Sequence, residues 1–309
     1  MTEKIAIIGA GLVGSGWAIV FARAGFEVSL YDSVDRAASA ALDVIASRLS
    51  DLKSFGLLSS EQEVLGRISV AADLRSALAD AIYAQESAYE QVEVKRELFS
   101  QIDAVIGSET LVGSSSSGIP SSAFTEHVAC RDRVLIAHPV NPPYLAPIVE
   151  LVPAPWTRPD AVKAVRALME RVGQSPVEMT REVEGFLLNR LQAVLLMEAW
   201  RLVEAGLATV EDVDLTIKHG LGLRWSFMGP FETIDLNAPG GVADYARRFG
   251  PLYQRIAASC TEQRVWSEDL ITRIEQQRRE KLPAAELAKR SAWRDRMLME
   301  LARRRAEQH

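Results

Sequence analysis

The stretch that decides the fold is KIAII at residues 4–8, which runs directly into GAGLVG at residues 9–14. KIAII is short, apolar and rich in isoleucine, which is typical of a buried strand. The apolar residues that follow the glycines, from Trp17 to Phe21, are spaced as in a buried helix. A strand that enters a helix through a glycine turn begins a β-α-β unit, so the sequence predicts an α/β fold with a parallel sheet.

The glycines have the spacing G-x-G-x-x-G between a strand and a helix, which is the context of a dinucleotide-binding turn. Gly9 permits the tight turn, Gly11 lets a pyrophosphate approach the backbone, and Gly14 lets helix and strand pack closely. The amides at the helix start, including those of Leu12 and Val13, lack helical partners and would bind the phosphates. The alternative is a glycine turn needed only for packing.

Asp32, at the end of the next predicted strand, completes this signature. It lies about 20 residues after the turn, where a carboxylate accepts hydrogen bonds from the adenosine ribose and repels a 2′-phosphate. NAD is therefore the expected cofactor, and Arg36 leaves NADP open as an alternative. Residues 5–22 are uncharged and also resemble a secretion signal, but their glycines favour the phosphate-binding turn.

Short β-branched runs alternate with helical patterns up to about residue 184, and helical patterns alone follow. This division predicts a doubly wound, mostly parallel sheet of the Rossmann type in residues 1–184 and an all-helical domain in residues 185–309. Residues 186–205 are apolar on nearly every side of a helix, so this helix is expected to be buried at a domain or subunit junction. Further strands are expected at 27–31, 67–70, 81–85, 110–114, 134–137, 148–151 and 177–179, and further helices at 36–55, after Ser60, and at 210–219, 242–249, 267–280 and 284–305.

Composition favours a small-molecule partner. The net charge is −6, whereas a surface for nucleic acid or anionic lipid needs a basic field. Cys130 and Cys260 lie far apart and have the spacing of neither a disulfide framework nor a metal site. We therefore expect no nucleic acid, no membrane and no metal, and a reducing compartment such as the cytoplasm.

His138 is the strongest candidate for proton transfer. It follows the predicted strand at 134–137, and in a doubly wound sheet the carboxyl ends of the strands face the ligand crevice. Glu150 interrupts the next apolar strand, where a carboxylate needs a partner such as an imidazole, which it would hold in one tautomer. Oxidation of an alcohol requires removal of its hydroxyl proton, a task suited to histidine. A structural histidine is the alternative.

Two further polar positions accompany this pair. Asn189 lies near the start of the 186–205 helix and would cost about 1–3 kcal/mol if it were buried without a partner. It is therefore expected to bind something in the cleft between the domains, either a ligand or backbone. The serine run at 114–117 follows a strand and offers hydroxyls to the same crevice, although such runs are usually loops.

Several motifs, in order along the chain, resemble the L-3-hydroxyacyl-CoA dehydrogenase superfamily. They are GAGLVG, HPVNPP with the later VELVP, GFLLNRL and EAWRLVEAG. The likeness covers essentially the whole chain and is greatest to the L-gulonate 3-dehydrogenase or lambda-crystallin subgroup, through GLGLRWSFMGPFET and AWRDRMLMELA. The resemblance implies a homodimeric, NAD-dependent enzyme that oxidises the C3 hydroxyl of a 3-hydroxy acid.

The resemblance also implies roles for individual residues. His138 matches the catalytic base and Glu150 its orienting partner. Asn189 matches the asparagine that binds the reacting oxygen, and Ser116 matches the serine that contacts substrate and nicotinamide. These four residues are the predicted catalytic set.

Glu90 and Lys95 match positions that the superfamily places beside the cofactor. The serine loop departs from the usual pattern, because Ser114-Ser115 stands where Asn or Ser is commonly followed by Thr. This departure leaves Ser115 and Ser117 open as alternatives to Ser116.

The charges favour a free hydroxy acid over a CoA thioester. Residues 41–66 offer only Arg48 and Lys53 to hold the phosphates of CoA. Arg224 is a forked cation that could clamp a carboxylate, with a surface or subunit salt bridge as the alternative. L-gulonate is the first expected substrate, and L-carnitine and L-3-hydroxyacyl-CoA are alternatives. A structural or NAD-sensing protein is the alternative of a different class, and the complete proton-transfer set argues against it.

Overall fold

The structure is a computed structural model that describes residues 2–260 and 265–307. The chain divides into two compact units, one of Met1–Arg190 with Ser291–His309 and one of Leu191–Arg290. The sequence places the boundary near residue 184 and assigns all later residues to the second domain. In the structure, by contrast, the last helix belongs to the first unit from Ser291 onward, because its apolar residues Leu298 and Met299 pack into that unit's core.

The first unit contains an eight-stranded sheet with the order β3-β2-β1-β4-β5-β6-β7-β8. The pairs are parallel except that β6 and β7 run antiparallel, which confirms the predicted mostly parallel Rossmann fold. The strands are β1 (Lys4–Ile8), β2 (Glu27–Tyr31), β3 (Ile68–Val70), β4 (Ala81–Glu86), β5 (Leu111–Ser114), β6 (Val134–Pro139), β7 (Ile148–Pro153) and β8 (Ser175–Glu178).

The strand order reverses between β1 and β4. From β1 the chain builds outward through β2 and β3, and it then returns to add β4 and β5 on the other side of β1. Ligands of open α/β sheets bind outside the carboxyl ends of the strands at such a switch point. The glycine turn that follows β1 therefore lies where this topology predicts a ligand.

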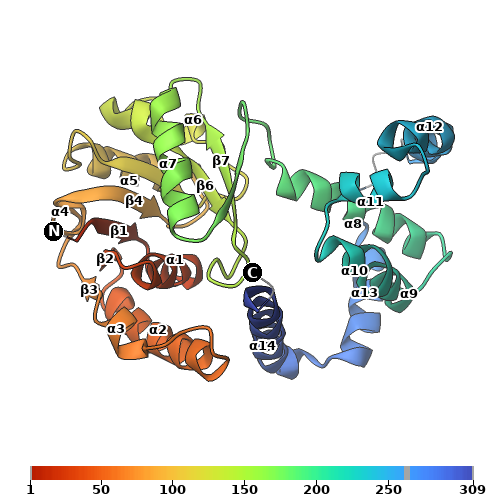
Figure 1. Cartoon of the computed structure of the whole chain (residues 1–309), viewed down its shortest axis with the longest axis horizontal. Helices are drawn as coiled ribbons and strands as arrows, with labels where there is room; N and C mark the ends of the chain where they lie inside the picture. Colours follow the sequence, from red (N-terminus) through yellow and green to blue (C-terminus); the bar gives the residue numbers. More distant parts are fainter. Residues whose placement is uncertain (1, 261–264, 308–309) are drawn as a thin grey trace. The chain divides into compact units, whose positions relative to one another are not determined.

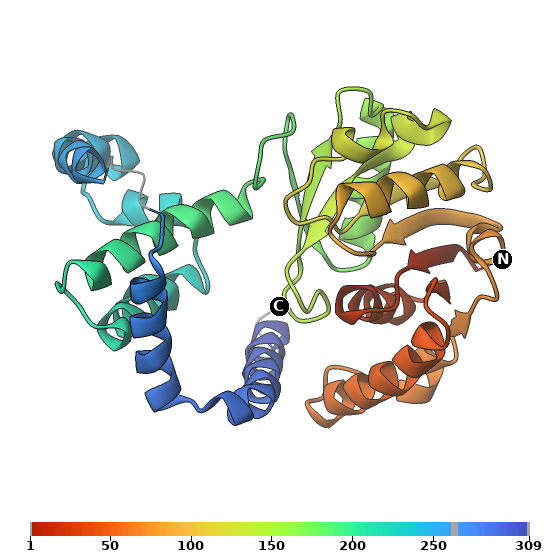
Figure 2. The same ribbon diagram turned by 180° about the vertical axis from the view of Figure 1, so that it is seen from behind.

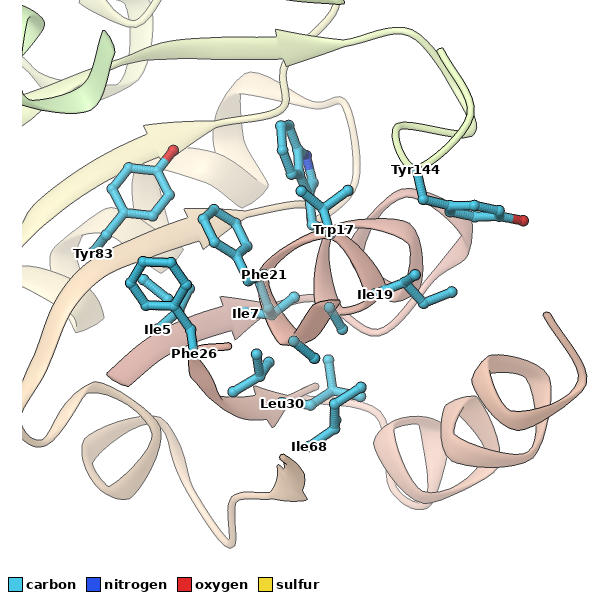
Figure 3. Packing of buried hydrophobic residues seen from close by; sticks show 14 of the residues in the cluster. Ile5, Ile7, Trp17, Ile19, Phe21, Phe26, Leu30, Ile68, Tyr83 and Tyr144 are labelled. Atoms are coloured by element: carbon cyan, nitrogen blue, oxygen red, sulfur yellow. The ribbon is translucent and has the colours of Figure 1, made fainter. Parts of the chain in front are cut away.

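Helices cover both faces of the sheet (Figures 1 and 2). The alternation of β1 separates the two cores, because Ile5 and Ile7 pack on one face while Ala6 and Ile8 pack on the other. Figure 3 shows the first core, in which Trp17 and Phe21 of α1 pack against the strands. One face carries α1 (Leu12–Arg23), α2 (Ala37–Ser54), α3 (Glu61–Leu65), α7 (Pro159–Arg171) and the end of α14 (Leu287–Ala306), and the other carries α4 (Leu74–Leu78), α5 (Val92–Asp103) and α6 (Ser122–Thr125).

The second unit is helical throughout its described residues, as the sequence predicts. Its α12 extends beyond the expected 242–249 and continues through Pro251. Its remaining helical elements are α8 (Leu188–Glu204), which begins in the first unit, α9 (Val210–Thr216), a π-helical turn (Ile217–Leu221), α10 (Gly222–Trp225), α11 (Pro230–Leu236), α12 (Gly241–Ser259), α13 (Glu268–Lys281) and a 3-10 turn (Ala284–Glu286). No helix in the described part of the chain is both long and apolar enough to cross a membrane.

Within the single chain, most of the helix predicted at 186–205 is exposed, although Phe186 just before α8 is buried. Val203 is the buried residue of α8, while Leu191 and Val194 are 63% and 74% exposed. The apolar character of this helix is evident from the sequence, but the chain alone does not cover it. The apolar side chains of α8 that remain exposed are Leu191, Val194, Leu195, Leu196 and Met197.

Candidate active site

The turn after β1 has a backbone that only glycine fits. Gly9 adopts φ +101°, and a Cβ there would lie 2.5 Å from the carbonyl oxygen of Ser87. A Cβ at Gly14 would overlap the carbonyl oxygen of Gly9, so this glycine allows α1 to pack closely against the turn. The predicted roles of both glycines in the turn thus have a steric basis.

Gly11 meets a different environment. It is the N-cap of α1, no side chain caps this helix end, and a Cβ would meet no atom of the protein within 4 Å. Open space therefore faces the amides of the first helical turn, including those of Leu12 and Val13, and such amides attract anions. This cradle fits the pyrophosphate of a dinucleotide.

Asp32 holds the turn from the end of β2. Its Oδ2 accepts from the amide of Ala10 at 2.7 Å and its Oδ1 from the amide of Val34 at 2.8 Å. Each carboxylate oxygen can accept a further hydrogen bond, as a ribose diol requires. Arg36 is exposed and faces Asp35 at 3.8 Å, an acidic neighbour that opposes a 2′-phosphate.

His138 and Glu150 are direct partners across the antiparallel β6–β7 ladder. Nδ1 of His138 lies 2.7 Å from Oε2 of Glu150, and the two residues are 7% and 2% exposed. The second carboxylate oxygen, Oε1, accepts the amides of Leu187 and Leu188 at 2.8 Å each. The start of α8 thus holds one side of the carboxylate while the imidazole holds the other.

Glu150 stays ionised in this setting. Burial alone would raise its pKa, but hydrogen bonds from His138, Leu188 and Leu187 outweigh burial, so the pKa of Glu150 lies below its ordinary value. An ionised carboxylate only accepts hydrogen bonds, so Nδ1 of His138 carries the proton that they share. Nε2 has no hydrogen-bond partner among the described residues, and in the neutral ring it is the basic nitrogen.

Two consecutive left-handed residues create this arrangement. Gly185 has φ +75° and Phe186 has φ +49°, a conformation that costs a residue with a Cβ. The buried ring of Phe186 packs against the His138 ring with centroids 5.8 Å apart. The turn brings the next two amides onto Glu150, so the strained backbone serves the same pair that the ring supports.

The serine loop is organised around Glu90. Ser116 is fully buried, and its hydroxyl lies 2.7 Å from Oε1 of Glu90 and 2.9 Å from the carbonyl of Ile119. The same Oε1 accepts the amides of Ser117 and Gly118 at 2.8 and 3.1 Å. Burial opposes ionisation of Glu90, but these bonds and nearby Lys95 keep its pKa below the ordinary value.

Asn189 contacts this loop through Ser117, the residue after Ser116. Its Nδ2 donates to the carbonyl of Ser117 at 2.5 Å. Ser117 is exposed, whereas the hydroxyl of Ser116 is occupied inside the loop. The structure therefore brings Asn189 together with Ser117, one of the two alternatives that the sequence leaves open.

Lys95 lies in a buried ion pair that the sequence reasoning missed. Its Nζ lies 2.9 and 3.0 Å from the two carboxylate oxygens of Glu86, and the residues are 1% and 0% exposed. The hydroxyl of Ser114 and the amide of Ala88 also donate to Glu86, and Oε2 of Glu90 lies 3.6 Å from Nζ. Glu86 ends β4, so the strand-end argument that singled out His138 could have identified it.

Asn141 is a second residue that the sequence reasoning missed. Its Oδ1 is buried and has no partner among the described residues, an arrangement that costs free energy unless a ligand or water supplies one. It lies in the HPVNPP segment just after His138. Arg224, by contrast, is exposed on α10 of the second unit, and its guanidinium makes no hydrogen bond or ion pair within the described residues.

A glycine turn with free amides at the switch point, followed by a ribose-binding carboxylate, defines the site of an NAD-dependent oxidoreductase. Residues 4–183 match the family model for the 3-hydroxyacyl-CoA dehydrogenase NAD binding domain, and residues 185–276 match its C-terminal domain. The chain therefore belongs to the 3-hydroxyacyl-CoA dehydrogenase family, and it is an NAD-dependent dehydrogenase that acts on the CH–OH group of a 3-hydroxy acid.

Similar proteins extend over most of the chain. A lambda-crystallin homolog of Bos taurus is 43% identical and covers 96% of this chain and 94% of its own. An L-carnitine dehydrogenase of Streptomyces griseus is 36% identical over 84% of this chain and 82% of its own. The solved structure of an NAD+-dependent 5-formyl-3-hydroxy-2-methylpyridine 4-carboxylic acid 5-dehydrogenase has a TM-score of 0.83 at 26% identity and covers 98% of both chains.

Proposed function

We propose that this enzyme oxidises the C3 hydroxyl of a small, free L-3-hydroxy acid, with L-gulonate as the first candidate. The observation that carries the reaction is the 2.7 Å hydrogen bond between His138 Nδ1 and Glu150 Oε2, which leaves Nε2 available. A general base must be unprotonated and within reach of a hydroxyl proton. Glu150 fixes the tautomer in which Nε2 of the neutral ring is the basic nitrogen, and the place of His138 at the end of β6 supports the condition of reach.

Each residue of the pair has a separate task. Nε2 of His138 accepts the hydroxyl proton, and the ionised Glu150 stabilises the imidazolium that forms and keeps the ring in position. NAD, when bound at the glycine turn, supplies the hydride acceptor. Because Glu150 is itself held by the amides of Leu187 and Leu188, it can remain an acceptor throughout.

Ser117 replaces Ser116 in the proposed substrate contacts. The Ser116 hydroxyl is buried and engaged by Glu90 and Ile119, so it would have to break existing bonds to reach a ligand. Ser117 is exposed on the same loop and is linked to Asn189 through its carbonyl. We assign the oxygen of the substrate to Ser117 and Asn189, while Ser116 and Glu90 position the loop.

The bases on the helical arm support a free acid over a CoA thioester. Lys53 is engaged by Glu61 at 3.4 Å, and Arg48 is half-buried. Neither is presented to solvent as an unpaired cation for the phosphates of CoA. The exposed guanidinium of Arg224 is the proposed carboxylate clamp, and the L-carnitine dehydrogenase among the relatives makes L-carnitine the second candidate.

A substrate panel tests this proposal. Purified protein with NAD is offered L-gulonate, L-3-hydroxybutyrate, L-carnitine and L-3-hydroxybutyryl-CoA, and NADH formation is followed by its absorbance. We expect turnover on a free acid, its loss in His138→Ala, and a raised KM for that acid in Arg224→Ala. Preference for the thioester would overturn the substrate assignment, and an unchanged KM in Arg224→Ala would overturn the clamp.

The exposed apolar side chains of α8 support a homodimer. Leu191, Val194 and Met197 are exposed on one chain, and exposed apolar groups of this kind mark interaction surfaces. A second copy of this chain could cover these side chains, so no other protein is needed. Light scattering should give twice the monomer mass for the wild type and a smaller mass for Val194→Glu, and a monomeric wild type would refute the dimer.

A further inference from the structure

The side chains of Tyr83, Gln85, Ser115 and Ser87 form a hydrogen-bonded series beside the glycine turn, and the proposed reaction does not use it. Tyr83 and Gln85 lie on β4 and are fully buried, Ser87 follows β4, and Ser115 follows β5. Figure 3 shows Tyr83 and Trp17 on either side of Phe21, with the Tyr83 hydroxyl pointing away from Phe26. All of these residues belong to the first unit.

The orientation of the Gln85 amide is fixed by its neighbours. One of its terminal atoms lies 3.2 Å from the carbonyl oxygen of Ala137, and a carbonyl can only accept. That atom is therefore the donor Nε2, and Oε1 faces the hydroxyl of Tyr83, which donates to it. Gly113 leaves room for this hydroxyl, because a Cβ at that position would overlap it.

The hydroxyl of Ser115 accepts from Gln85 and in turn donates to Ser87. Its Oγ lies 2.7 Å from Nε2 of Gln85 and 3.2 Å from Nε1 of Trp17, both of which can only donate. A hydroxyl oxygen has two lone pairs, so these two bonds exhaust its capacity to accept. Its own proton must then go to its remaining neighbour, Oγ of Ser87, at 2.9 Å.

Ser87 therefore ends the series with a proton that has no acceptor among the described residues. Its side chain is half-buried, and its carbonyl group lies against Gly9 of the glycine turn. It stands at the carboxyl end of β4, beside β1, where the strand order reverses and a dinucleotide binds. The free donor and the cradle with free amides thus lie at the same edge of the sheet.

We propose that the Ser87 hydroxyl donates a hydrogen bond to an acceptor oxygen of the bound dinucleotide. Tyr83, Gln85 and Ser115 are positioning residues, because the direction of their hydrogen bonds turns the Ser87 proton outward. A hydroxyl fixed as a donor binds an acceptor without first reorienting, which is a form of preorganisation. This inference rests on NAD binding at the glycine turn, and not on the substrate or on the role of His138.

The first test is the affinity for NADH, measured through the fluorescence of the bound nucleotide. Ser87→Ala should raise the Kd by about three- to tenfold, the range expected for one neutral hydrogen bond. Ser87→Thr keeps the hydroxyl and should restore most of the affinity. Ser69→Ala, on β3 of the same unit, is the matched control and should bind as the wild type does. An unchanged Kd in Ser87→Ala overturns the proposal.

The second test examines the positioning residues. Ser115→Ala removes the donor that fixes Ser87, and it should raise the Kd by about two- to threefold, less than the full hydrogen bond. The double variant Ser87→Ala/Ser115→Ala should bind no more weakly than Ser87→Ala, because both changes remove the same interaction. Fully additive effects would overturn the positioning role.

Two further measurements locate the acceptor on the dinucleotide and distinguish this proposal from the proposed substrate and base. Titration with ADP-ribose shows which half of the dinucleotide accepts the bond, because a loss of affinity shared with ADP-ribose locates the acceptor outside the nicotinamide. His138→Ala should lose turnover and keep wild-type NADH affinity. A weakened Kd in Ser87→Ala therefore stands even if the proposed substrate or base is wrong.

Discussion

Two buried acid–base pairs of the first unit differ in what they leave unpaired. Lys95 and Glu86 are closed, because Nζ contacts both carboxylate oxygens, which also accept from Ser114 and Ala88. His138 and Glu150 are also in direct contact, at 2.7 Å, but Nε2 of His138 has no partner among the described residues. A group can exchange a proton with a substrate only through a free position. In our proposal, the open pair, His138 and Glu150, therefore carries the chemistry, and the closed pair, Lys95 and Glu86, supports the structure.

The largest effect should follow from removal of the His138 imidazole. His138→Ala should lower kcat/KM by about 10²- to 10⁴-fold, the usual contribution of a general base. The variant leaves the Glu150 carboxylate with the amides of Leu187 and Leu188 as its remaining partners, so its free energy of unfolding should also fall, by about 1–3 kcal/mol. Steady-state kinetics and urea unfolding measure the two quantities. Activity retained within a few-fold would assign the base to another residue.

The next effect concerns the closed pair and appears in stability. Lys95→Met leaves the Glu86 carboxylate buried without its cation, which costs about 3–5 kcal/mol of unfolding free energy. The exposed Lys163, changed to Met, is the matched control and should alter stability by less than about 0.5 kcal/mol. Glu86→Gln added to Lys95→Met should recover part of the loss. Wild-type stability with lost turnover would instead make Lys95 part of the chemistry.

The strands are the part of the fold that the sequence predicts best. The expected spans 4–8 and 27–31 coincide with β1 and β2. Short β-branched runs bounded by glycine or charged residues seldom form anything other than a strand. The surface that covers the apolar side chains of α8 could not be predicted, since an apolar helix does not reveal its partner. The return of residues 291–309 to the first unit depends on long-range packing that leaves no local signal.

The candidate site likewise contains residues that the sequence could identify and residues that it could not. His138 was identifiable because it follows a predicted strand, and Glu150 because it interrupts an apolar one. The antiparallel register that makes them direct partners is visible only in the structure. Glu86 was missed because the predicted strand ended one residue before it. The difference between Ser116 and Ser117 depends on which hydroxyl turns inward, and four adjacent serines give no sequence signal for that.

A smaller effect distinguishes Ser117, which is exposed, from Ser116, whose hydroxyl is bonded inside the loop. Ser117→Ala should lower kcat/KM by about tenfold, the value of one hydrogen bond to the reacting oxygen. Ser116→Ala should keep kcat/KM within about twofold and lose about 1 kcal/mol of stability, because its hydroxyl supports Glu90 inside the loop. Kinetics and urea unfolding on both variants decide the assignment. The reverse pattern would return the substrate contact to Ser116.

The smallest expected effect is the pH dependence that Glu150 adds to stability. Its pKa in the folded protein lies below the ordinary value of 4.5, because the bonds from His138, Leu188 and Leu187 outweigh burial. The unfolded chain therefore binds more protons than the folded one as the solution becomes acidic, and the contribution of Glu150 is complete above pH 4.5 and lost as the pH falls through the folded pKa.

Comparison with Glu150→Gln isolates this contribution from the other carboxylates, Glu90 included. The difference in unfolding free energy between wild type and variant, measured with urea across the acid range, should be greatest at neutral pH and should narrow in acid. A difference that stays constant with pH would mean that Glu150 titrates alike in both states. The amides at the start of α8 and the imidazole would then not favour its ionised form, and the open pair would lose the fixed acceptor that holds His138 in its basic tautomer.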